Sequence, residues 1–287
     1  MTLEAMRKFF KYYLGMFLYK FSTDQARKII QDNFSLGFES NSNKISWRLM
    51  RFYLAQHTSK KGKQSHLIEL HKSFWKGFRG RRFHEITNKD PANVIKKEFI
   101  PLIEAAEIAS KQYKFRTLIE IGSGNGQVLD YMANRMGGIF EEFIGLDLND
   151  EQVALNNNSN QNRKLKFVCC DASEWLYGQN INNTLILTHR GVLEYFSEDM
   201  VNKLFSYLSN GNNGVLLIEP IDHHHDLIKI NSSFTFGYEF SFSHNYPNLL
   251  QKNGFNILYL EDKSVDLWRT LMIFAVVLDG YFSDSRN

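Results

Sequence analysis

The chain has 287 residues, 43% of them hydrophobic and 23% charged, so it is long enough to bury a substantial core. It has no run of 18 or more apolar residues, so we expect no membrane-spanning helix. The net charge of +3 conceals an asymmetry, because residues 1–116 carry 23 Lys and Arg against 10 Asp and Glu, whereas the rest of the chain is acidic.

The basic N-terminal part predicts an anionic partner, which can be a membrane surface, a phosphorylated substrate or nucleic acid. The alternative is a basic helical surface that packs on the acidic part of the same chain, and both interpretations stay open. The N-terminus lacks a small-residue cleavage site, so we expect no signal peptide. Cys169 and Cys170 are adjacent in an apolar stretch, and we expect buried, reduced thiols and a cytoplasmic location.

Apolar residues recur at helical spacing from Met6 to Phe21, with Arg7, Lys8 and other basic residues among them. This pattern predicts an amphipathic basic helix. Residues 3–21 are therefore a candidate for peripheral contact with the inner face of an anionic membrane, and packing against the protein's own surface is the alternative. Further helices are expected over 45–57, 65–78 and 91–112, which makes residues 1–113 a helical substrate-binding or cap region.

The segment 76–83 is the densest mixture of basic and aromatic residues in the chain. Arginine and phenylalanine side chains can contact phosphates and stack on bases, which keeps nucleic acid as a less favoured partner. The oligomeric state is not predicted by these patterns.

The stretch from Thr117 to Asp130 combines a short apolar strand, a glycine-rich turn and the start of a helix. The turn has glycine at positions 122, 124 and 126, and Glu120 precedes it. Glycine tolerates positive φ and has no Cβ atom, so such a turn lets a ligand approach the backbone. A strand, a glycine-rich turn and a helix N-terminus together predict a nucleotide-type site.

The spacing E-x-G-x-G-x-G resembles motif I of the class I S-adenosylmethionine-dependent methyltransferases. The resemblance implies that this loop receives the amino-acid end of S-adenosylmethionine, with S-adenosylhomocysteine as the product. Nicotinamide-binding folds favour G-x-G-x-x-G instead, and Gln127 stands directly after Gly126 here.

The second strand, Phe143–Asp147, ends in an acid 21 residues after Gly126, which is suitably spaced for ribose hydroxyls. The third strand, Leu165–Cys170, leads into Asp171 and Ala172, where the resemblance implies contact with the adenine. The predicted cofactor-binding residues are Glu120, Gly122, Ser123, Gly124, Gly126, Asp147, Leu148, Asp171, Ala172 and His189.

Strands and helices continue to alternate down the chain. The remaining expected strands are Thr184–Thr188, Val215–Ile218, Phe255–Leu260 and Leu271–Leu278, and the expected helices are Ser197–Leu208 and Asn248–Lys252. This order predicts an α/β fold, Rossmann-like and doubly wound, with a mostly parallel seven-stranded sheet and an antiparallel C-terminal hairpin. The predicted methyltransferase domain spans residues 114–287.

Candidate catalytic residues follow the fourth and fifth strands, because ligands bind at the carboxyl ends of parallel strands. They are His189 after the fourth strand and Glu219 after the fifth, together with His244 in a later loop that precedes the last expected helix. Thr188–Gly191 reads T-H-R-G where the family's N-methylating enzymes often carry N/D-P-P-Y/F, which favours oxygen as the methyl acceptor. The histidines at 223–225 are expected to form a loop and no metal site is predicted, although two of them with Asp222 or Asp226 remain an alternative.

These patterns predict a methyltransferase that uses S-adenosylmethionine and acts on a small molecule, a glycan or a lipid precursor. A methyltransferase for RNA or protein is the first alternative. A non-catalytic protein that binds the same cofactor is the second.

Overall fold

The computed structural model describes residues 2–35, 45–60, 62–77, 80, 82, 99–237, 239–265 and 268–277. The chain divides into two compact units. The first comprises Met1–Gly80 together with Thr235–Ser241, and the second comprises Arg81–Phe234 and Phe242–Asn287. The helix just before residue 114 belongs to the second unit, which also contains the glycine-rich turn.

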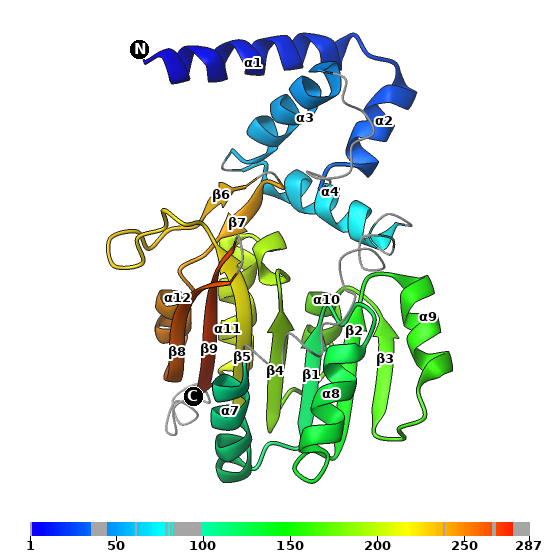
Figure 1. Ribbon diagram of the computed structural model, residues 1–287, viewed down its shortest axis with the longest axis vertical. Coiled ribbons are helices and arrows are strands. Elements are labelled where there is room, and N and C mark those ends of the chain that lie inside the picture. Colours follow the sequence, from blue (N-terminus) through cyan, green and yellow to red (C-terminus); the bar gives the residue numbers. More distant parts are fainter. Residues whose placement is uncertain are drawn as a thin grey trace. The chain divides into compact units, whose positions relative to one another are not determined.

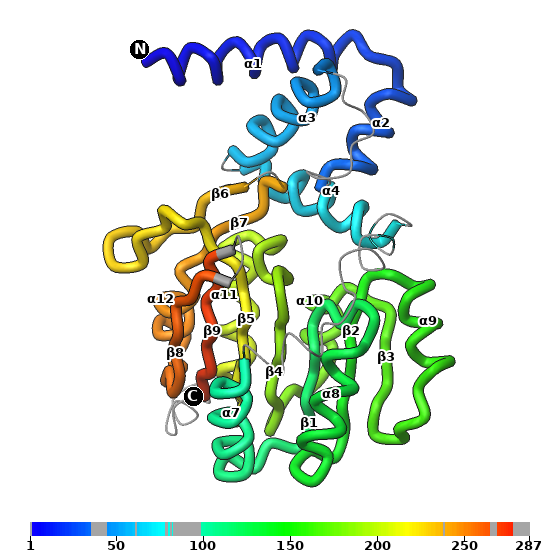
Figure 2. The backbone as a smooth tube through the Cα atoms, viewed as in Figure 1, coloured from blue at the N-terminus to red at the C-terminus, as the bar shows by residue number. Residues whose placement is uncertain are grey.

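The second unit is built on a seven-stranded sheet in the order β3-β2-β1-β4-β5-β9-β8 (Figures 1 and 2). The strands are β1 (Thr117–Ile121), β2 (Glu142–Asp147), β3 (Leu165–Cys169), β4 (Thr184–His189), β5 (Asn213–Ile221), β8 (Phe255–Val265) and β9 (Trp268–Val277). Strands β1 to β5 are parallel, and β9 lies antiparallel between β5 and β8. The predicted Rossmann-like fold with an antiparallel C-terminal hairpin is therefore confirmed.

Helices cover both faces of this sheet (Figure 1). One face carries α7 (Ile100–Tyr113), α8 (Gln127–Met136) and α9 (Asp150–Ser159); the other carries α10 (Ala172–Tyr177), α11 (Glu198–Leu208) and α12 (Tyr246–Lys252). The central strands are buried on both faces, which is why their sequences are continuous apolar runs rather than alternating ones.

Two sequence expectations, the strand lengths and the burial of the cysteines, differ from the structure in this unit. Strands β5 and β8 are longer than expected, so Glu219 lies inside β5 rather than after it. Cys169 is exposed and Cys170 is half-buried, so the expected burial of both thiols is wrong. The physical reason is that β3 is an edge strand with a neighbour on only one side. The start of the helix expected over 91–112 lies outside the described residues, and α7 accounts for its later part.

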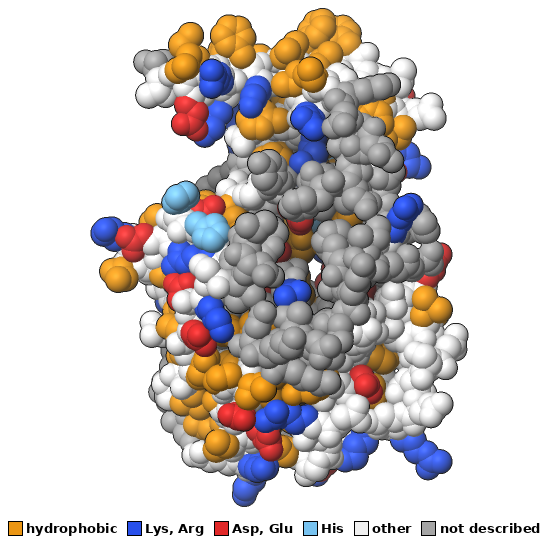
Figure 3. Space-filling view, in the orientation of Figure 1, with side chains coloured by type: hydrophobic (Ala, Val, Ile, Leu, Met, Phe, Trp, Pro, Cys, Tyr) orange, Lys and Arg blue, Asp and Glu red, His pale blue; other side chains and the backbone are white. Residues whose placement is uncertain are grey.

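The first unit contains α1 (Leu3–Lys20), α2 (Asp24–Asp32), α3 (Ile45–Thr58) and α4 (Gln64–Lys76). The hydroxyls of Thr2 and Thr23 cap α1 and α2 by accepting hydrogen bonds from backbone amides, each at 3.2 Å. Figure 3 shows hydrophobic side chains along the upper side of α1 and basic side chains beside them. The short helix α2 has no counterpart among the sequence predictions.

The segment Thr235–Ser241 packs with these helices although it is distant in sequence. It belongs to a hairpin of β6 (Phe234–Phe236) and β7 (Ser241–Ser243). The Phe240 ring lies 5.2 Å from the Arg51 guanidinium, and the Phe240 carbonyl lies 3.4 Å from His71 Nε2. His71 Nδ1 lies 2.8 Å from the Ser35 hydroxyl, and burial lowers the pKa of His71 to about 3. A neutral imidazole therefore ties this hairpin to α4.

None of the helices in the described ranges is long and apolar enough to span a lipid bilayer.

Candidate active site

The glycine-rich turn connects β1 to α8 through three residues with positive φ. The φ angles are 71° at Gly122, 47° at Gly124 and 76° at Gly126. A Cβ atom on Gly126 would lie 2.6 Å from the Phe167 ring, and one on Gly122 would lie 2.7 Å from Val192 Cγ2. Only glycine satisfies both the backbone angle and the close approach at these positions.

Hydrogen bonds from neighbouring elements hold this turn in place. The Gly124 amide donates to Asp147 Oδ2 at 2.8 Å, and the Asn156 side chain donates to the Gly124 carbonyl at 2.8 Å. Gln152 in turn donates to Asn156 Oδ1 at 2.9 Å. The sequence pattern did not identify Asn156 or Gln152. Both are polar amides at buried positions of α9, beside the buried Val153. Both amides position the turn from beneath.

Parallel register brings the ends of β1, β2 and β4 to one edge of the sheet. Ile121 pairs with Leu146 on one side and with Thr188 on the other. The glycine-rich turn, Asp147 and His189 therefore leave neighbouring strands at the same level.

Glu120 is buried beneath the turn, on the sheet face covered by α8. Its Oε2 atom makes no hydrogen bond within the described part of the chain. Burial raises the pKa of Glu120 well above its ordinary value, and the negative charge of Asp147 adds to this effect. An orphaned buried carboxylate oxygen is suited to receiving a cationic group, because an opposite charge would favour its ionised form.

Two acids are predicted to contact the nucleoside. Asp147 is the last residue of β2, and Asp171 directly precedes α10. Asp147 Oδ1 accepts a hydrogen bond from the Asn149 amide at 2.9 Å. Asp171 is the N-cap of α10, and its Oδ1 accepts from the amides of Ser173 at 3.0 Å and Glu174 at 3.3 Å. Ala172 is buried at the start of that helix, and Leu148 is half-buried after β2. Because β1, β2 and β3 are parallel and in register, both acids follow or end strands at the edge of the sheet where the glycine-rich turn lies.

Ser123, in the turn itself, is buried, and its hydroxyl has no hydrogen-bond partner in the described ranges. A Cβ atom on Gly145 would lie 2.8 Å from this hydroxyl. The turn therefore has one unsatisfied hydroxyl and one unsatisfied carboxylate oxygen, that of Glu120.

His189 is the last residue of β4, and its ring packs edge-on against Phe99 with centroids 5.8 Å apart. The Nε2 atom is buried and makes no hydrogen bond in the described portion of the chain. Burial, with a further contribution from Arg190, lowers the pKa of His189 to about 3, so the imidazole is neutral at physiological pH. Arg190 has a φ of 58°, a strained value for a residue with a side chain.

Glu219 is fully buried in β5, where its carboxylate holds the turn that follows β4. It accepts hydrogen bonds from the amides of Val192 at 3.1 Å and Leu193 at 3.2 Å. Burial raises the pKa of Glu219 to about 7, and the amide donors act in the opposite direction. The side chain therefore stabilises the start of the 3-10 turn Leu193–Tyr195.

His244 holds the same turn from the other side. Its Nε2 lies 3.1 Å from the carbonyls of both Leu193 and Phe196, and its Nδ1 lies 2.6 Å from the Ser233 hydroxyl. Because carbonyls only accept hydrogen bonds, Nε2 carries the proton and Nδ1 accepts from Ser233. Glu219 and His244 thus bind the amide and the carbonyl of the same residue, Leu193, a convergence that the sequence did not reveal.

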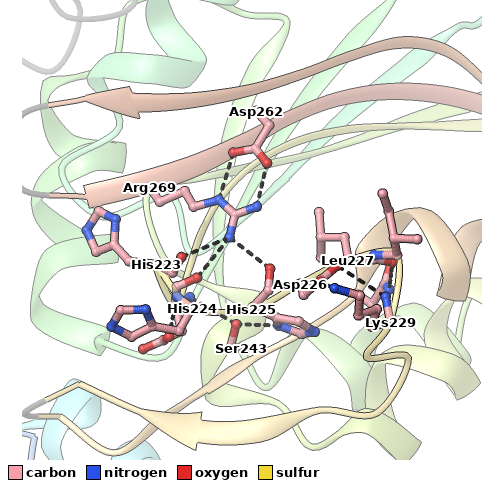
Figure 4. Close-up of polar contacts among 12 residues, drawn as sticks. His223, His224, His225, Asp226, Leu227, Lys229, Ser243, Asp262 and Arg269 are labelled. Carbon is pink, nitrogen blue, oxygen red and sulfur yellow. Dashed lines mark hydrogen bonds and ion pairs between the residues drawn. The ribbon is translucent and has the colours of Figure 1, made fainter.

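The three histidines at 223–225 lie in a loop stabilised by Arg269 (Figure 4). Arg269 binds both carboxylate oxygens of Asp262, at 2.9 and 2.6 Å, and donates to the carbonyls of Asp222, His223 and His225. His225 is buried, with Nδ1 2.7 Å from the Ser243 hydroxyl and Nε2 3.2 Å from the Ile230 carbonyl. Within the described ranges, no group of three His, Cys, Asp or Glu side chains is arranged to hold a metal.

The predicted site residues therefore separate into two sets. The cofactor set and His189 lie at the carboxyl edge of β1, β2 and β4. Glu219 and His244 instead form hydrogen bonds with the backbone of the turn after β4. The assignment of individual residues to cofactor binding or to the reaction remains a prediction.

Comparison with known proteins gives one family match and several similar folds. Residues 118–211 match the family described as a methyltransferase domain. Magnesium protoporphyrin IX methyltransferase from Synechocystis PCC 6803 with bound SAH has a TM-score of 0.53 and 13% identity, over 74% of this chain and 100% of that chain. The same enzyme with bound SAM has a TM-score of 0.50 and 14% identity, over 74% of this chain and 97% of that chain.

A SAM-dependent methyltransferase from Leishmania major has a TM-score of 0.50 and 12% identity, over 78% of this chain and 89% of that chain. At these identities the solved structures show the shared fold. A comparison with curated proteins gave no match.

The residues of the site fit S-adenosylmethionine as cofactor. The unpartnered oxygen of Glu120 suits the cationic part of that molecule, and the glycine positions leave room where side chains would otherwise lie. The matched family segment begins at β1 and includes the glycine-rich turn, Asp147, Asp171 and His189. Residues 118–211 therefore match a methyltransferase domain, and the chain shares the fold of S-adenosylmethionine-dependent methyltransferases.

Proposed function

We propose that the chain transfers the methyl group of S-adenosylmethionine to an oxygen atom of a small molecule, a glycan or a lipid precursor. The single observation that carries this proposal is the neutral imidazole of His189, whose Nε2 lacks a partner in the described residues at the carboxyl end of β4. The unprotonated nitrogen of a neutral imidazole accepts a hydrogen bond from a hydroxyl group. The proton in that hydrogen bond is the one that an oxygen acceptor must lose when it is methylated.

When bound, S-adenosylmethionine supplies an electrophilic methyl group. We infer that Glu120 faces its cationic end and that Asp147 receives the ribose hydroxyls, with the turn residues Gly122 to Gly126 lining the approach. Asp171, Ala172 and Leu148 would border the adenine. These roles are supported by the common edge of the sheet at which β1, β2 and β3 end. Substitution of each residue tests its role.

His189 would orient the acceptor hydroxyl and take its proton as the oxygen loses it. The low pKa of this imidazole disfavours its cationic form, so the hydrogen bond to the hydroxyl is the first contribution we expect. Glu219 and His244 then act at a distance, because they hold the turn that begins four residues after His189. We propose them as positioning residues rather than as bases.

The alternative acceptors, RNA and protein, rest on the basic and aromatic residues of segment 76–83. Half of that segment, residues 78, 79, 81 and 83, lies outside the described residues, and no contact of the described half favours these acceptors. Cys169 and Cys170 form no disulfide among the described residues, which supports a reducing, cytoplasmic compartment.

Transfer of labelled methyl from S-adenosylmethionine to cell extract, fractionated into lipid, glycan, RNA and protein, tests the acceptor class. Label in the lipid, glycan or small-molecule fraction, with mass spectrometry locating the methyl on oxygen, is the expected result. Label confined to RNA or protein, or found only on nitrogen, contradicts the proposal.

His189→Gln tests the role of the imidazole once an acceptor is known. We expect turnover at saturating S-adenosylmethionine to fall by about 10²–10⁴-fold, the usual contribution of a general base. His224→Gln is the matched control, because that histidine is exposed on the loop after β5. If His189→Gln weakens S-adenosylhomocysteine binding in calorimetry but leaves saturated turnover unchanged, His189 serves the cofactor and not the acceptor.

A further inference from the structure

Helix α1 packs on α3 through one face only. Gly15 is its buried residue, and a Cβ atom there would lie 2.1 Å from the Leu49 carbonyl oxygen and 2.9 Å from Tyr53 Cβ. The Tyr12 ring lies on the same side, 5.2 Å from the Tyr53 ring. This contact defines the inner face of α1, where glycine permits the two helix backbones to approach closely.

The opposite face of α1 is apolar and exposed. Its residues are Leu3 (66% exposed), Met6 (40%), Phe9 (52%), Phe10 (68%), Tyr13 (48%), Leu14 (51%) and Phe17 (56%), followed by Phe21 (76%) after the helix. With about 100° between successive residues, these positions form one continuous stripe on the side away from Gly15.

Aromatic rings within this stripe contact one another, and no element of the described residues covers them. The centroids of Phe9 and Tyr13 are 4.4 Å apart, and those of Phe17 and Phe21 are 4.6 Å apart. A contiguous stripe of this length is larger than the scattered apolar residues that normally occur on a protein surface, and such patches mark interaction sites.

Basic residues border the stripe. Helical spacing places Arg7 and Lys11 along one border and Lys20 along the other. The helix has one acid, Glu4, which pairs with Lys8 at 2.8 Å. Figure 3 shows the blue basic side chains beside the hydrophobic ones on α1. The surroundings of the apolar stripe are therefore cationic.

We infer that α1 lies in the interfacial layer of an anionic lipid bilayer, with its apolar stripe among the acyl chains and its basic borders at the headgroups. Large apolar side chains flanked by Lys and Arg are the composition of interfacial helices. A second copy of this chain is the less suitable occupant, because pairing two such stripes would bring their basic borders together. The inference does not depend on the methyl acceptor or on turnover.

Flotation of the full-length protein with lipid vesicles tests this inference. The protein is expected to float with vesicles of phosphatidylcholine mixed with phosphatidylglycerol, and to float poorly with phosphatidylcholine alone. High salt should release it, because the Debye length falls to about 3 Å at 1 M salt.

The double variant Phe10→Ser/Phe17→Ser should weaken vesicle binding by about tenfold or more, since it removes two exposed aromatic side chains from the stripe. Its thermal unfolding should match that of the native chain because neither ring is buried in the protein. Ile108→Ser/Ile228→Ser is the matched control, since it removes two apolar residues of 69% and 93% exposure elsewhere and should leave binding unchanged.

Two outcomes overturn the inference. One is a native chain that fails to float with anionic vesicles at low salt, and the other is equal binding by the native chain and the Phe10/Phe17 variant. If light scattering shows a dimer that the same variant dissociates, and vesicles do not bind, the stripe is an interface between copies of this chain.

Discussion

Glu219 offers the sharpest test of the energetics of this site. Its carboxyl is fully buried, and burial raises its pKa from 4.5 to about 7. In the unfolded chain the same group returns to its ordinary pKa. The difference corresponds to about 3 kcal/mol, at 1.36 kcal/mol for each unit of pKa.

The sign of the effect follows from which state keeps the proton. Below pH 4.5 both states are protonated, so the group adds nothing to the pH dependence. Between pH 4.5 and about 7 the unfolded chain loses the proton and the folded chain keeps it, so the free energy of unfolding falls as pH rises. Above pH 7 the full loss of about 3 kcal/mol is present.

The variant Glu219→Gln removes this titration while retaining a side-chain oxygen near the amides of Val192 and Leu193. Its stability relative to the native chain should therefore rise by about 3 kcal/mol between pH 4.5 and pH 8. Urea unfolding at several pH values in this range measures the difference between the two proteins. Other titrating groups cancel because they are present in both.

Glu174→Gln is the control, since that glutamate is exposed at the start of α10. A difference between native and Glu219→Gln stabilities that is the same at every pH would refute the reasoning. It would mean that the amide donors of the turn offset the burial of the carboxyl completely.

Two further substitutions test the cofactor edge of the sheet. Asp147→Ala should weaken S-adenosylhomocysteine binding in calorimetry by about 10- to 150-fold, from the loss of about 1.5–3 kcal/mol of hydrogen bonding to a charged group; an affinity equal to that of the exposed control Asp150→Ala would remove Asp147 from the site. Gly126→Ala should destabilise the fold by about 1–3 kcal/mol and abolish tight cofactor binding, because its φ is 76° and its Cβ would meet the Phe167 ring at 2.6 Å. Thermal unfolding measures this effect. The control is Gly138→Ala, whose Cβ meets nothing within 4 Å and which should leave stability nearly unchanged. Equal melting temperatures for the two variants would contradict the steric argument.

Much of the second unit was predictable from local patterns. Buried parallel strands require continuous apolar runs, and each run from β1 to β5 stands out between polar or glycine-rich segments. The glycine-rich turn was recognisable because positive φ angles restrict the residue type. The antiparallel C-terminal hairpin was implied by the resemblance to a family, but the position of β9 between β5 and β8 came from the structure, since periodicity does not say which strand lies beside β5.

The positions of the candidate catalytic residues needed the tertiary structure. The sequence patterns proposed His189, Glu219 and His244 alike as catalytic candidates. In the structure Glu219 and His244 bond to the backbone of Leu193, while His189 Nε2 has no partner in the described residues. The residue type alone does not separate these cases, because the partner of a buried polar atom is set by long-range packing.

The amino-acid sequence by itself determined which segments become strands, where the backbone must take positive φ, and that one face of α1 is apolar. Tertiary structure decided that Cys169 lies on an edge strand, that Asn156 supports the glycine-rich turn, and that Phe240 packs against the N-terminal helices. Local patterns depend on residues a few positions apart, whereas these contacts join residues separated by tens to hundreds of positions and exist only once the chain has folded.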